Sequence, residues 1–305
     1  MWTRADIPPQ TGRLAVVTGA NAGLGYEIAQ GLAAAGAAVV LACRSEQRAE
    51  AAAGRLRDSV PGAQVDVRRL DLADLASVAA FADGLAADHD RLDLLVNNAG
   101  LMAVDESRTA DGFEMQIATN HLGHFALTAH LLPLLARSPG ARVATMSSMG
   151  HRRGRLRVDD LMFERRGYGR WQPYFDSKQA NLLFTLELQR RLRACAILVA
   201  SHAKRLLSVE GTSKGGGGRN GKGQFKRLRY NANPSAPCDP PHLQTGHLRR
   251  SVAWELAGMV ARVGTNLRYG RWLEFGTSTI AARPWLRRAL AECRAQIVAI
   301  LSKPM

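Results

Sequence analysis

The chain contains 305 residues, of which 46% are hydrophobic, so it is long and apolar enough for one large α/β domain or two modest ones. Its opening residues carry charges and prolines, and no run of about 18 uncharged apolar residues occurs. We therefore expect a cytoplasmic protein without a secretory signal or a membrane-spanning helix. The four cysteines show neither CxxC nor metal-ligand spacing, which argues against a zinc site or a disulfide framework.

The net charge of +15 is distributed unevenly along the chain. Residues 194–305 contain 18 Lys and Arg against 5 Asp and Glu, whereas residues 1–193 contain 23 against 21. This asymmetry indicates two electrostatically unlike units. It favours a polyanion or an acidic partner for the second unit, although a solvated basic face fits the same counts.

The first two thirds of the chain alternate short apolar runs with longer amphipathic stretches, which is typical of repeated βαβ units. Strands are predicted near 14–18, 38–42, 65–70, 92–96 and 141–146. Helices are predicted near 23–36, 46–57, 74–87, 110–137 and 173–193. The fold class is therefore α/β, with a Rossmann-like doubly wound parallel sheet formed by a first domain over residues 1–193.

The sequence pattern changes in residues 194–305, where strands and helices no longer alternate. This pattern predicts a second domain with a small α+β fold. A helix-like stretch near 195–208 leads into GTSKGGGGRNGKG, which we expect to be a mobile loop, and then into the extended connector NPSAPCDPP. The runs HLRRSVAWEL and GMVARVGTN are expected to pair as a hairpin across Ala257 and Gly258. A terminal amphipathic helix beginning near Pro284 carries a predicted apolar stripe of Trp285, Leu286, Leu290, Ile297 and Leu301.

The glycine-rich segment TGANAGLG, from Thr18 to Gly25, directly follows the first predicted strand and opens a helix. Without side chains, backbone amides and the helix N-terminus can approach a pyrophosphate. A tight turn with no ligand fits the same letters. Three further motifs favour a nucleotide-binding turn over a turn with no ligand. NNAG follows the fourth predicted strand, Ser147 and Ser148 follow the fifth, and YFDSK comes after them.

Tyr174 and Lys178 lie one helical turn apart on the same face of a predicted helix. Hydride transfer to or from a carbonyl carbon needs a group that moves a proton on the oxygen. A tyrosine with its ordinary pKa of about 10 is a poor base at neutral pH, but a neighbouring ammonium favours the phenolate. A tyrosine and a lysine at this spacing also occur by chance on exposed helices. The pair indicates a catalytic role only together with the glycine-rich loops.

Cofactor preference is read at the end of the second strand, in Ala42-Cys43-Arg44-Ser45. An acidic residue there would accept hydrogen bonds from the ribose of NAD, whereas Arg44 offers a planar cation to a 2′-phosphate. NADP is therefore favoured over NAD, the alternative being an ordinary arginine flanking a helix. His121 and His124 have no carboxylate cluster nearby, so we expect packed or solvated histidines and no metal.

In this order, TGANAGLG, NNAG, a strand-end serine and YFDSK resemble the short-chain dehydrogenase/reductase family over residues 10–193. The resemblance implies an oxidoreductase that acts on a carbonyl or alcohol of a small molecule. It implies Tyr174 as acid/base, Lys178 on the nicotinamide ribose, Ser148 on the substrate oxygen with Ser147 as fallback, and Asn120 in a proton relay through water. It implies cofactor contacts from Gly19, Ala20, Asn21, Ala22, Gly23, Leu24, Gly25, Arg44, Asp71, Leu72, Asn98, Ala99, Gly100, Tyr174 and Lys178.

Two finer features extend the resemblance. NHLGHF at 120–125 and the spacing from Ser148 to Tyr174 are similar to the branch that contains retinol dehydrogenases and protochlorophyllide-reductase-like proteins. Asp71 matches the family position that contacts the adenine amino group, with Leu72 beside it.

Beyond the Tyr/Lys helix the family pattern is lost, because no Pro-Gly turn, lid helix or seventh strand is recognisable. ILVAS at 197–201 is the one candidate for a sixth strand. Instead, PPHLQTGHLRRSV, ARVGTNLRYGRWLEFGT and ARPWLRRAL resemble the tail-component or head-tail connector family of tailed phages, which implies assembly in a ring. The chain thus reads as a chimera with a junction near 189–197.

Two alternatives to a dehydrogenase stay open. One is a virion assembly protein that carries a truncated dehydrogenase as a passenger and forms a homo-oligomer with phage structural partners. The other is nucleic-acid binding by the basic segment, against which the aromatic residues are not interleaved with the basic ones as a stacking platform requires.

Overall fold

The computed structural model describes residues 3–138, 140–208, 235, 238–241, 246–257 and 260–301. The glycine-rich segment and part of the proline-rich connector lie outside these residues. The chain divides into two compact units, one formed chiefly by Met1–Leu188 and the other chiefly by residues from Gln189 onwards. None of the described helices is both long and apolar enough to cross a membrane.

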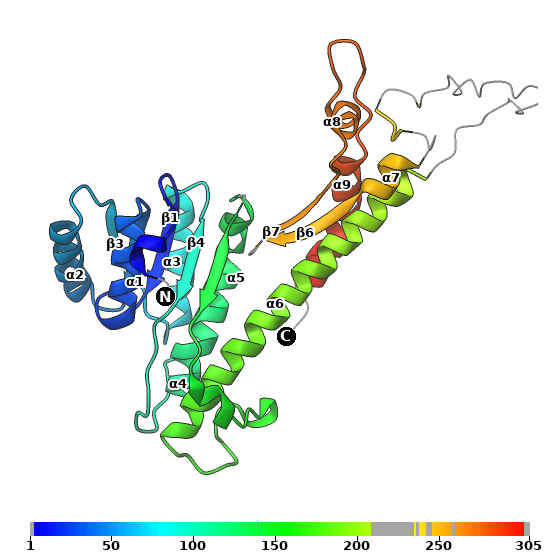
Figure 1. The fold of residues 1–305 in the computed structure, drawn as a ribbon. Coiled ribbons are helices and arrows are strands. Elements are labelled where there is room, and N and C mark those ends of the chain that lie inside the picture. The colour runs from blue at the N-terminus through cyan, green and yellow to red at the C-terminus, as the bar shows by residue number, and fades with distance from the viewer. Residues whose placement is uncertain are drawn as a thin grey trace, which may run out of the picture. The chain divides into compact units, whose positions relative to one another are not determined.

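The first unit is built on a parallel sheet of five strands, as the sequence predicts (Figure 1). The strands are β1 (Leu14–Thr18), β2 (Ala38–Cys43), β3 (Val65–Arg69), β4 (Leu94–Asn97) and β5 (Arg142–Thr145), in the order β3-β2-β1-β4-β5. Chain order reverses between β1 and β4, so the connections on either side of this point leave in opposite directions. A crevice forms at the carboxyl ends of strands at such a reversal, which is where ligands bind in open α/β sheets.

Helices cover both faces of this sheet. They are α1 (Gly23–Ala34), α2 (Glu46–Ser59), α3 (Leu75–Asp88), the single turn α4 (Met115–Ile117) and α5 (Gly123–Ala136). Alternate residues of β1 enter different cores, since Val16 packs with α3 and α5 whereas Val17 packs with α1 and α2. Each fully buried Val or Leu contributes about 1.5–3 kcal/mol, and burial on both faces explains why these strands are continuously apolar.

The predicted helix over 110–137 begins later and is not regular. Helical structure starts at Met115, and residues Ala118–Leu122 form a π-helical segment before α5 begins. Asn120 lies inside this segment. One extra residue per turn shifts the side chains that follow, and π-segments of this kind are found most often at functional sites.

Helix α6 (Trp171–Leu206) corrects the prediction of two helices and of a possible sixth strand at 197–201. It is one continuous helix, and its second half belongs to the second unit. After Pro173 in its first turn, α6 contains no glycine or proline that could end it. Its buried residues recur at helical spacing, at Cys195, Ala196, Val199, Ala200 and Ala203. A short apolar run such as ILVAS fits a strand or a buried helix face equally well, and only packing decides between them.

The second unit contains α7 (His247–Ser251), a two-stranded sheet of β6 (Ala253–Ala257) and β7 (Val260–Gly264), α8 (Arg268–Phe275) and α9 (Leu286–Leu301). The expected strand pairing is present, but HLRRS forms α7 and does not extend the first strand. Trp285, Leu248 and Val252 pack with Ala203 and Leu207 from the end of α6. This unit therefore has a hydrophobic core of its own.

The predicted stripe of the terminal helix is wrong at one position. Trp285, Ala289 and Cys293 are buried, whereas Leu290 is 54% exposed. The N-terminus of α9 is capped from a distance by Glu274, which accepts the backbone N–H groups of Trp285 and Leu286 at 2.8 Å and that of Arg287 at 2.9 Å. Burial opposes ionisation of this carboxyl, but these hydrogen bonds prevail and lower the pKa of Glu274.

Candidate active site

The glycine turn between β1 and α1 has a geometry that side chains would prevent. Gly19 and Gly23 have φ of +65° and +55°, in the left-handed region that favours glycine. A Cβ on Gly25 would lie 2.4 Å from the carbonyl oxygen of Gly19 and 2.6 Å from Asn98 Nδ2. The turn can therefore fold this tightly against the loop that follows β4 only with glycine at position 25.

The N-terminus of α1 is left open for a ligand. Its N-cap residue, Ala22, makes no side-chain hydrogen bond to the first turn of the helix. The first N–H groups of a helix have no partner within it and carry the positive end of its dipole. A phosphate group is the kind of ligand that such an end accepts.

A cavity of about 340 Å³ lies at this turn and at the carboxyl ends of the neighbouring strands. Most of the predicted cofactor contacts line it, namely Gly19, Asn21, Ala22, Leu24, Gly25, Arg44, Asp71, Leu72, Asn98, Ala99 and Gly100. Ala20 is completely buried and Gly23 is not among the lining residues. The donor set and the absent side chains fit a dinucleotide.

Sequence reasoning missed several lining residues, among them Cys43, Leu101 and Thr119. Cys43 was detectable, since it is the last residue of β2 and immediately precedes Arg44. Thr119 was not, because the π-helical segment brings it to the cavity.

Arg44 and Asp71 both line the cavity, and they follow the second and third strands of the sheet. Arg44 is exposed, and within the described part of the chain it has no hydrogen bond or ion pair, so its charge is available. Asp71 uses one carboxylate oxygen to accept the N–H of Ala73 at 3.0 Å, which holds the loop after β3.

Thr18, the last residue of β1, holds the loop after β4. Its hydroxyl oxygen accepts the N–H groups of Asn98 and Ala99, both at 2.9 Å, and lies 2.8 Å from His124 Nε2. His124 Nδ1 lies 3.0 Å from the carbonyl oxygen of Asn120 and must donate to it. His124 Nε2 then accepts the Thr18 hydroxyl proton.

His124 is therefore a buried neutral histidine. Complete burial lowers its pKa to about 4, so it is uncharged at neutral pH. It links the glycine turn to the π-helical segment. The described residues contain no group of three His, Cys, Asp or Glu arranged to hold a metal ion.

Asn120 joins the β4 loop to α6. Its Oδ1 accepts the N–H of Leu101 at 2.7 Å, and its Nδ2 donates to the Leu101 carbonyl at 2.9 Å and to Ser177 Oγ at 3.0 Å. Its own carbonyl oxygen accepts from His124 and from Asn181 Nδ2 at 3.0 Å. The side chain thus ties the loop after β4 to Ser177 on α6, and none of its hydrogen bonds among the described residues goes to Tyr174.

Tyr174 and Lys178 are not among the residues that line the cavity, but Lys178 lies near both the Tyr174 ring and the cavity residue Gly100. Its Nζ is 5.6 Å from the centre of the Tyr174 ring and donates to the Met146 carbonyl at 3.3 Å. A Cβ on Gly100, which lines the cavity, would lie 3.5 Å from the same Nζ. Burial lowers the pKa of Lys178, because few polar groups replace the water around its ammonium.

The two serines after β5 have different hydrogen bonds. Ser147 Oγ donates to the Lys178 carbonyl at 2.9 Å and so helps to hold α6. Ser148 Oγ accepts the Gly150 N–H at 3.0 Å, and no acceptor for its own proton occurs among the residues that the structure describes. Ser148 is thus better placed than Ser147 to donate to a further group.

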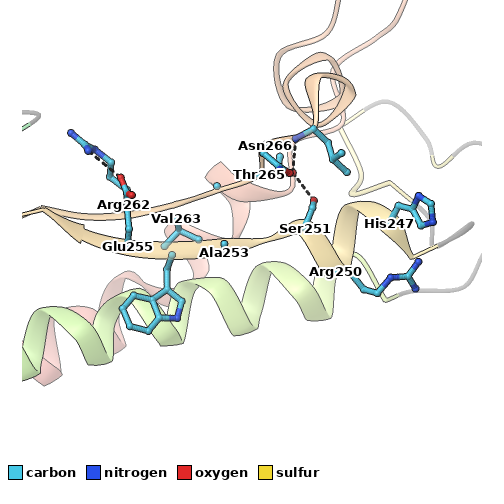
Figure 2. Close-up of a pocket in the computed structure, with 12 residues that line it drawn as sticks. His247, Arg250, Ser251, Ala253, Glu255, Arg262, Val263, Thr265 and Asn266 are labelled. Carbon is cyan, nitrogen blue, oxygen red and sulfur yellow. Dashed lines mark hydrogen bonds and ion pairs between the residues drawn. The ribbon is translucent and has the colours of Figure 1, made fainter.

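A second and larger cavity, of about 920 Å³, lies over β6 and β7 in the second unit (Figure 2). His247, Arg250, Arg262 and Glu255 are among its lining residues, with Glu255 paired to Arg262 at 3.1 Å. Leu267, the residue before α8, also lines it.

Comparison with known proteins assigns the first unit. The profile of the short chain dehydrogenase family matches residues 13–207. Retinol dehydrogenase 12 from Homo sapiens is 47% identical over 195 residues, which cover 64% of this chain and 60% of the relative. Retinol dehydrogenase 13 from Homo sapiens is 43% identical over 197 residues, which cover 65% and 59%.

Solved structures show the same part of the fold. An uncharacterized protein from Mycobacterium paratuberculosis is 52% identical with a TM-score of 0.58, over 63% of this chain and 67% of that one. A metagenomic short-chain oxidoreductase in complex with NADP is 26% identical with a TM-score of 0.50, over 61% and 78%. The chain spans about 60% of the length of the retinol dehydrogenases that it resembles. By the match over residues 13–207, the chain belongs to the short chain dehydrogenase family.

Proposed function

We propose that the chain is an NADP-dependent oxidoreductase that interconverts a carbonyl and an alcohol, with Tyr174 as the acid/base. The observation that carries this proposal is that the buried Lys178 ammonium lies near both the Tyr174 ring and Gly100 of the cofactor cavity. Tyr174 and Lys178 lie on α6, Gly100 lies in the loop after β4, and the glycine turn forms the neighbouring wall of the cavity.

When bound, the nicotinamide ring supplies or accepts a hydride. In the direction of reduction, the Tyr174 hydroxyl donates its proton to the carbonyl oxygen as the hydride reaches the carbon. The Lys178 ammonium stabilises the phenolate that remains, and Ser148 donates a hydrogen bond to the same substrate oxygen. In the reverse direction Tyr174 receives the proton of the alcohol. Asn120 holds the two backbone segments at this site, and a water relay through it remains part of the proposal.

The preference for NADP over NAD rests on Arg44. Its exposed cation lines the cavity directly after β2, where a 2′-phosphate would extend from the adenosine ribose. The substrate class is suggested by the relatives named retinol dehydrogenases. We therefore take retinaldehyde as the probe substrate, and we expect the enzyme to act in the cytoplasm.

The experiment measures NADPH binding by fluorescence and NADPH oxidation with retinaldehyde. Tyr174→Phe should retain NADPH binding and lose about 100-fold or more in turnover, because proton transfer is removed while the ring stays. Gly25→Ala should lose binding itself, since its Cβ has no room. Unchanged turnover in Tyr174→Phe would refute the assigned acid/base role, and absence of NADPH binding by the unaltered chain would refute the function.

Assembly of a homo-oligomer is the second candidate function. It is favoured by the fact that the runs resembling phage tail components fold into a compact unit with its own core around Trp285. Light scattering of the full chain distinguishes the candidates. A ring-sized oligomer built through the second unit supports assembly, whereas a monomer removes it.

A further inference from the structure

Helix α8 presents an exposed surface on which aromatic and cationic side chains alternate, which corrects the expectation that the aromatic residues of the basic segment are not interleaved with the basic ones. Tyr269, Trp272 and Phe275 are 37%, 50% and 63% exposed, and Arg268 and Arg271 are exposed as well. With about 100° of rotation per residue, the order around the helix is Arg271, Phe275, Arg268, Trp272 and Tyr269. The Arg287 guanidinium lies over the Phe275 ring, 5.1 Å from its centre, but all three rings still reach solvent, and such a patch on a short helix marks an interaction surface.

The opposite face of α8 is fixed, so the exposed residues are presented from a rigid support. Gly270 and Glu274 are buried, and Glu274 holds the start of α9 through backbone N–H groups. Thr265 Oγ1 accepts the N–H of Leu267 at 3.1 Å and lies 2.5 Å from Ser251 Oγ, which fixes the entry to the helix (Figure 2).

The charge of this surface is not neutralised by neighbours. Neither Arg268 nor Arg271 forms a hydrogen bond or ion pair within the described ranges. Every carboxylate in the described part of the second unit is already paired with a basic side chain or a helix end, namely Asp239, Glu255, Glu274 and Glu292. The adjoining cavity over β6 and β7 is lined by His247 and Arg250, both of which have interaction partners.

A second copy of this chain is a poor occupant. A two-fold contact through α8 would bring the Arg268 and Arg271 charges of both copies into one interface, and like charges in a contact are destabilising. The excess of 18 Lys and Arg over 5 Asp and Glu in residues 194–305 favours an anionic occupant.

We infer that α8 and the adjoining cavity bind single-stranded nucleic acid, independently of the dehydrogenase site. Guanidinium groups pair with phosphates, and aromatic rings stack on bases whose faces are exposed. In a duplex those faces are covered by neighbouring base pairs, so Tyr269, Trp272 and Phe275 would have nothing to stack on. Alternation of the two kinds of side chain matches alternation of phosphate and base along a single strand.

The test is fluorescence anisotropy of a labelled oligothymidylate with the full chain, at about 50 mM and about 200 mM salt. We expect tighter binding of the single strand than of a duplex of equal length. Trp272→Ala should weaken binding about fivefold or more, because one stacked base is lost. Arg271→Gln should weaken binding and lower the slope of log affinity against log salt by about 0.7, since one phosphate contact is lost.

Two matched controls keep the result specific. Arg294→Gln removes the same charge from exposed α9, and Leu290→Ala removes an apolar side chain that is 54% exposed on that helix. Both should bind as the unaltered chain does. The inference is overturned if no oligonucleotide binds at low salt, or if Arg294→Gln and Arg271→Gln act equally.

Binding of two other ligands distinguishes base stacking on the aromatic rings from electrostatic attraction to any anion. Heparin offers negative charge without bases, so equal affinity for heparin together with no effect of Trp272→Ala would also overturn the inference. Binding to phosphatidylserine vesicles that needs Trp272, without oligonucleotide binding, would assign the surface to a membrane instead.

Discussion

A single buried histidine shows how residue-scale physics ties the cofactor cavity to the rest of the unit. His124 accepts a hydrogen bond from the Thr18 hydroxyl at Nε2 and donates one to the Asn120 carbonyl from Nδ1. Only the neutral ring can make both of these hydrogen bonds. Protonation would turn Nε2 from an acceptor into a donor. The Thr18 hydroxyl could then no longer donate to His124, and the Val96 carbonyl oxygen, at 3.3 Å, would be the acceptor left to it among the described residues.

This predicts a pH dependence of stability. The pKa of His124 falls from its ordinary 6.5 to about 4 in the folded state, so the unfolded chain binds the extra proton first as pH is lowered. The stabilisation is fully present above about pH 6.5 and is lost as pH falls towards 4, by about 3 kcal/mol in all.

Urea unfolding between pH 7 and pH 4 measures the effect. The free energy of unfolding of His124→Gln should change less over this range than that of the unaltered chain. His130→Gln is the matched control, since His130 is exposed and should leave the pH dependence unchanged. Identical slopes for His124→Gln and the unaltered chain would contradict the assignment of His124 as a buried neutral group.

Among the elements, α9 depends on a cap that comes from another helix. The Glu274 carboxylate satisfies three backbone N–H groups at the start of α9, and its neighbour Arg287 pairs with it at 3.0 Å. Helix ends without such partners leave buried donors unpaired.

We predict that Glu274→Ala destabilises the second unit by about 1–3 kcal/mol, because buried N–H groups lose their acceptor. Thermal unfolding followed by circular dichroism measures the change. Glu255→Ala is the control, since Glu255 is exposed and its pair with Arg262 contributes little. Equal melting of the two variants would show that the cap does not stabilise α9.

The elements of the first unit were predictable from sequence, whereas α6 was not. Strands fully buried on both faces give apolar runs of strand length between helices, and all five predicted strands are present. Ile197–Ser201 has the same composition as such a strand. It is helical because Val199, Ala200 and Ala203 pack on one side of a continuous helix, and no local signal distinguishes this case.

At the scale of the whole molecule, the chain contains two units that differ in their hydrophobic cores and in their net charge. The first unit packs around its sheet, and the second packs around Trp285. Helix α6 is shared, since its first half carries Tyr174 and Lys178 and its end contributes Ala203 and Leu207 to the second core.

We predict two thermal transitions in calorimetry of the full chain. NADPH should raise only the transition of the first unit, because a ligand stabilises the unit that binds it. Glu274→Ala should lower only the other transition. One joint transition that moves with both changes would show that α6 couples the two units into one cooperative system.

The motif residues of the candidate site were predictable from the sequence, but the hydrogen bonds that join them were not. Spacing identified the glycine turn, Arg44, Asp71 and the Tyr174/Lys178 pair, because each motif is local in sequence. The links made by Thr18, His124 and Asn120 join residues 80 or more positions apart or depend on a π-helical segment. Sequence periodicity does not carry that information.

The sequence by itself determined the parallel α/β sheet, the glycine-lined turn and the unequal charge of the two units, because these follow from apolar periodicity, from missing side chains and from counting. Only the tertiary structure decided that α6 runs unbroken, that His124 is neutral, and that Trp272 stands among arginines on an exposed helix face. The reason is physical: burial, pKa and surface pattern depend on which distant residues exclude water from a group, and a linear order of residues leaves that choice open.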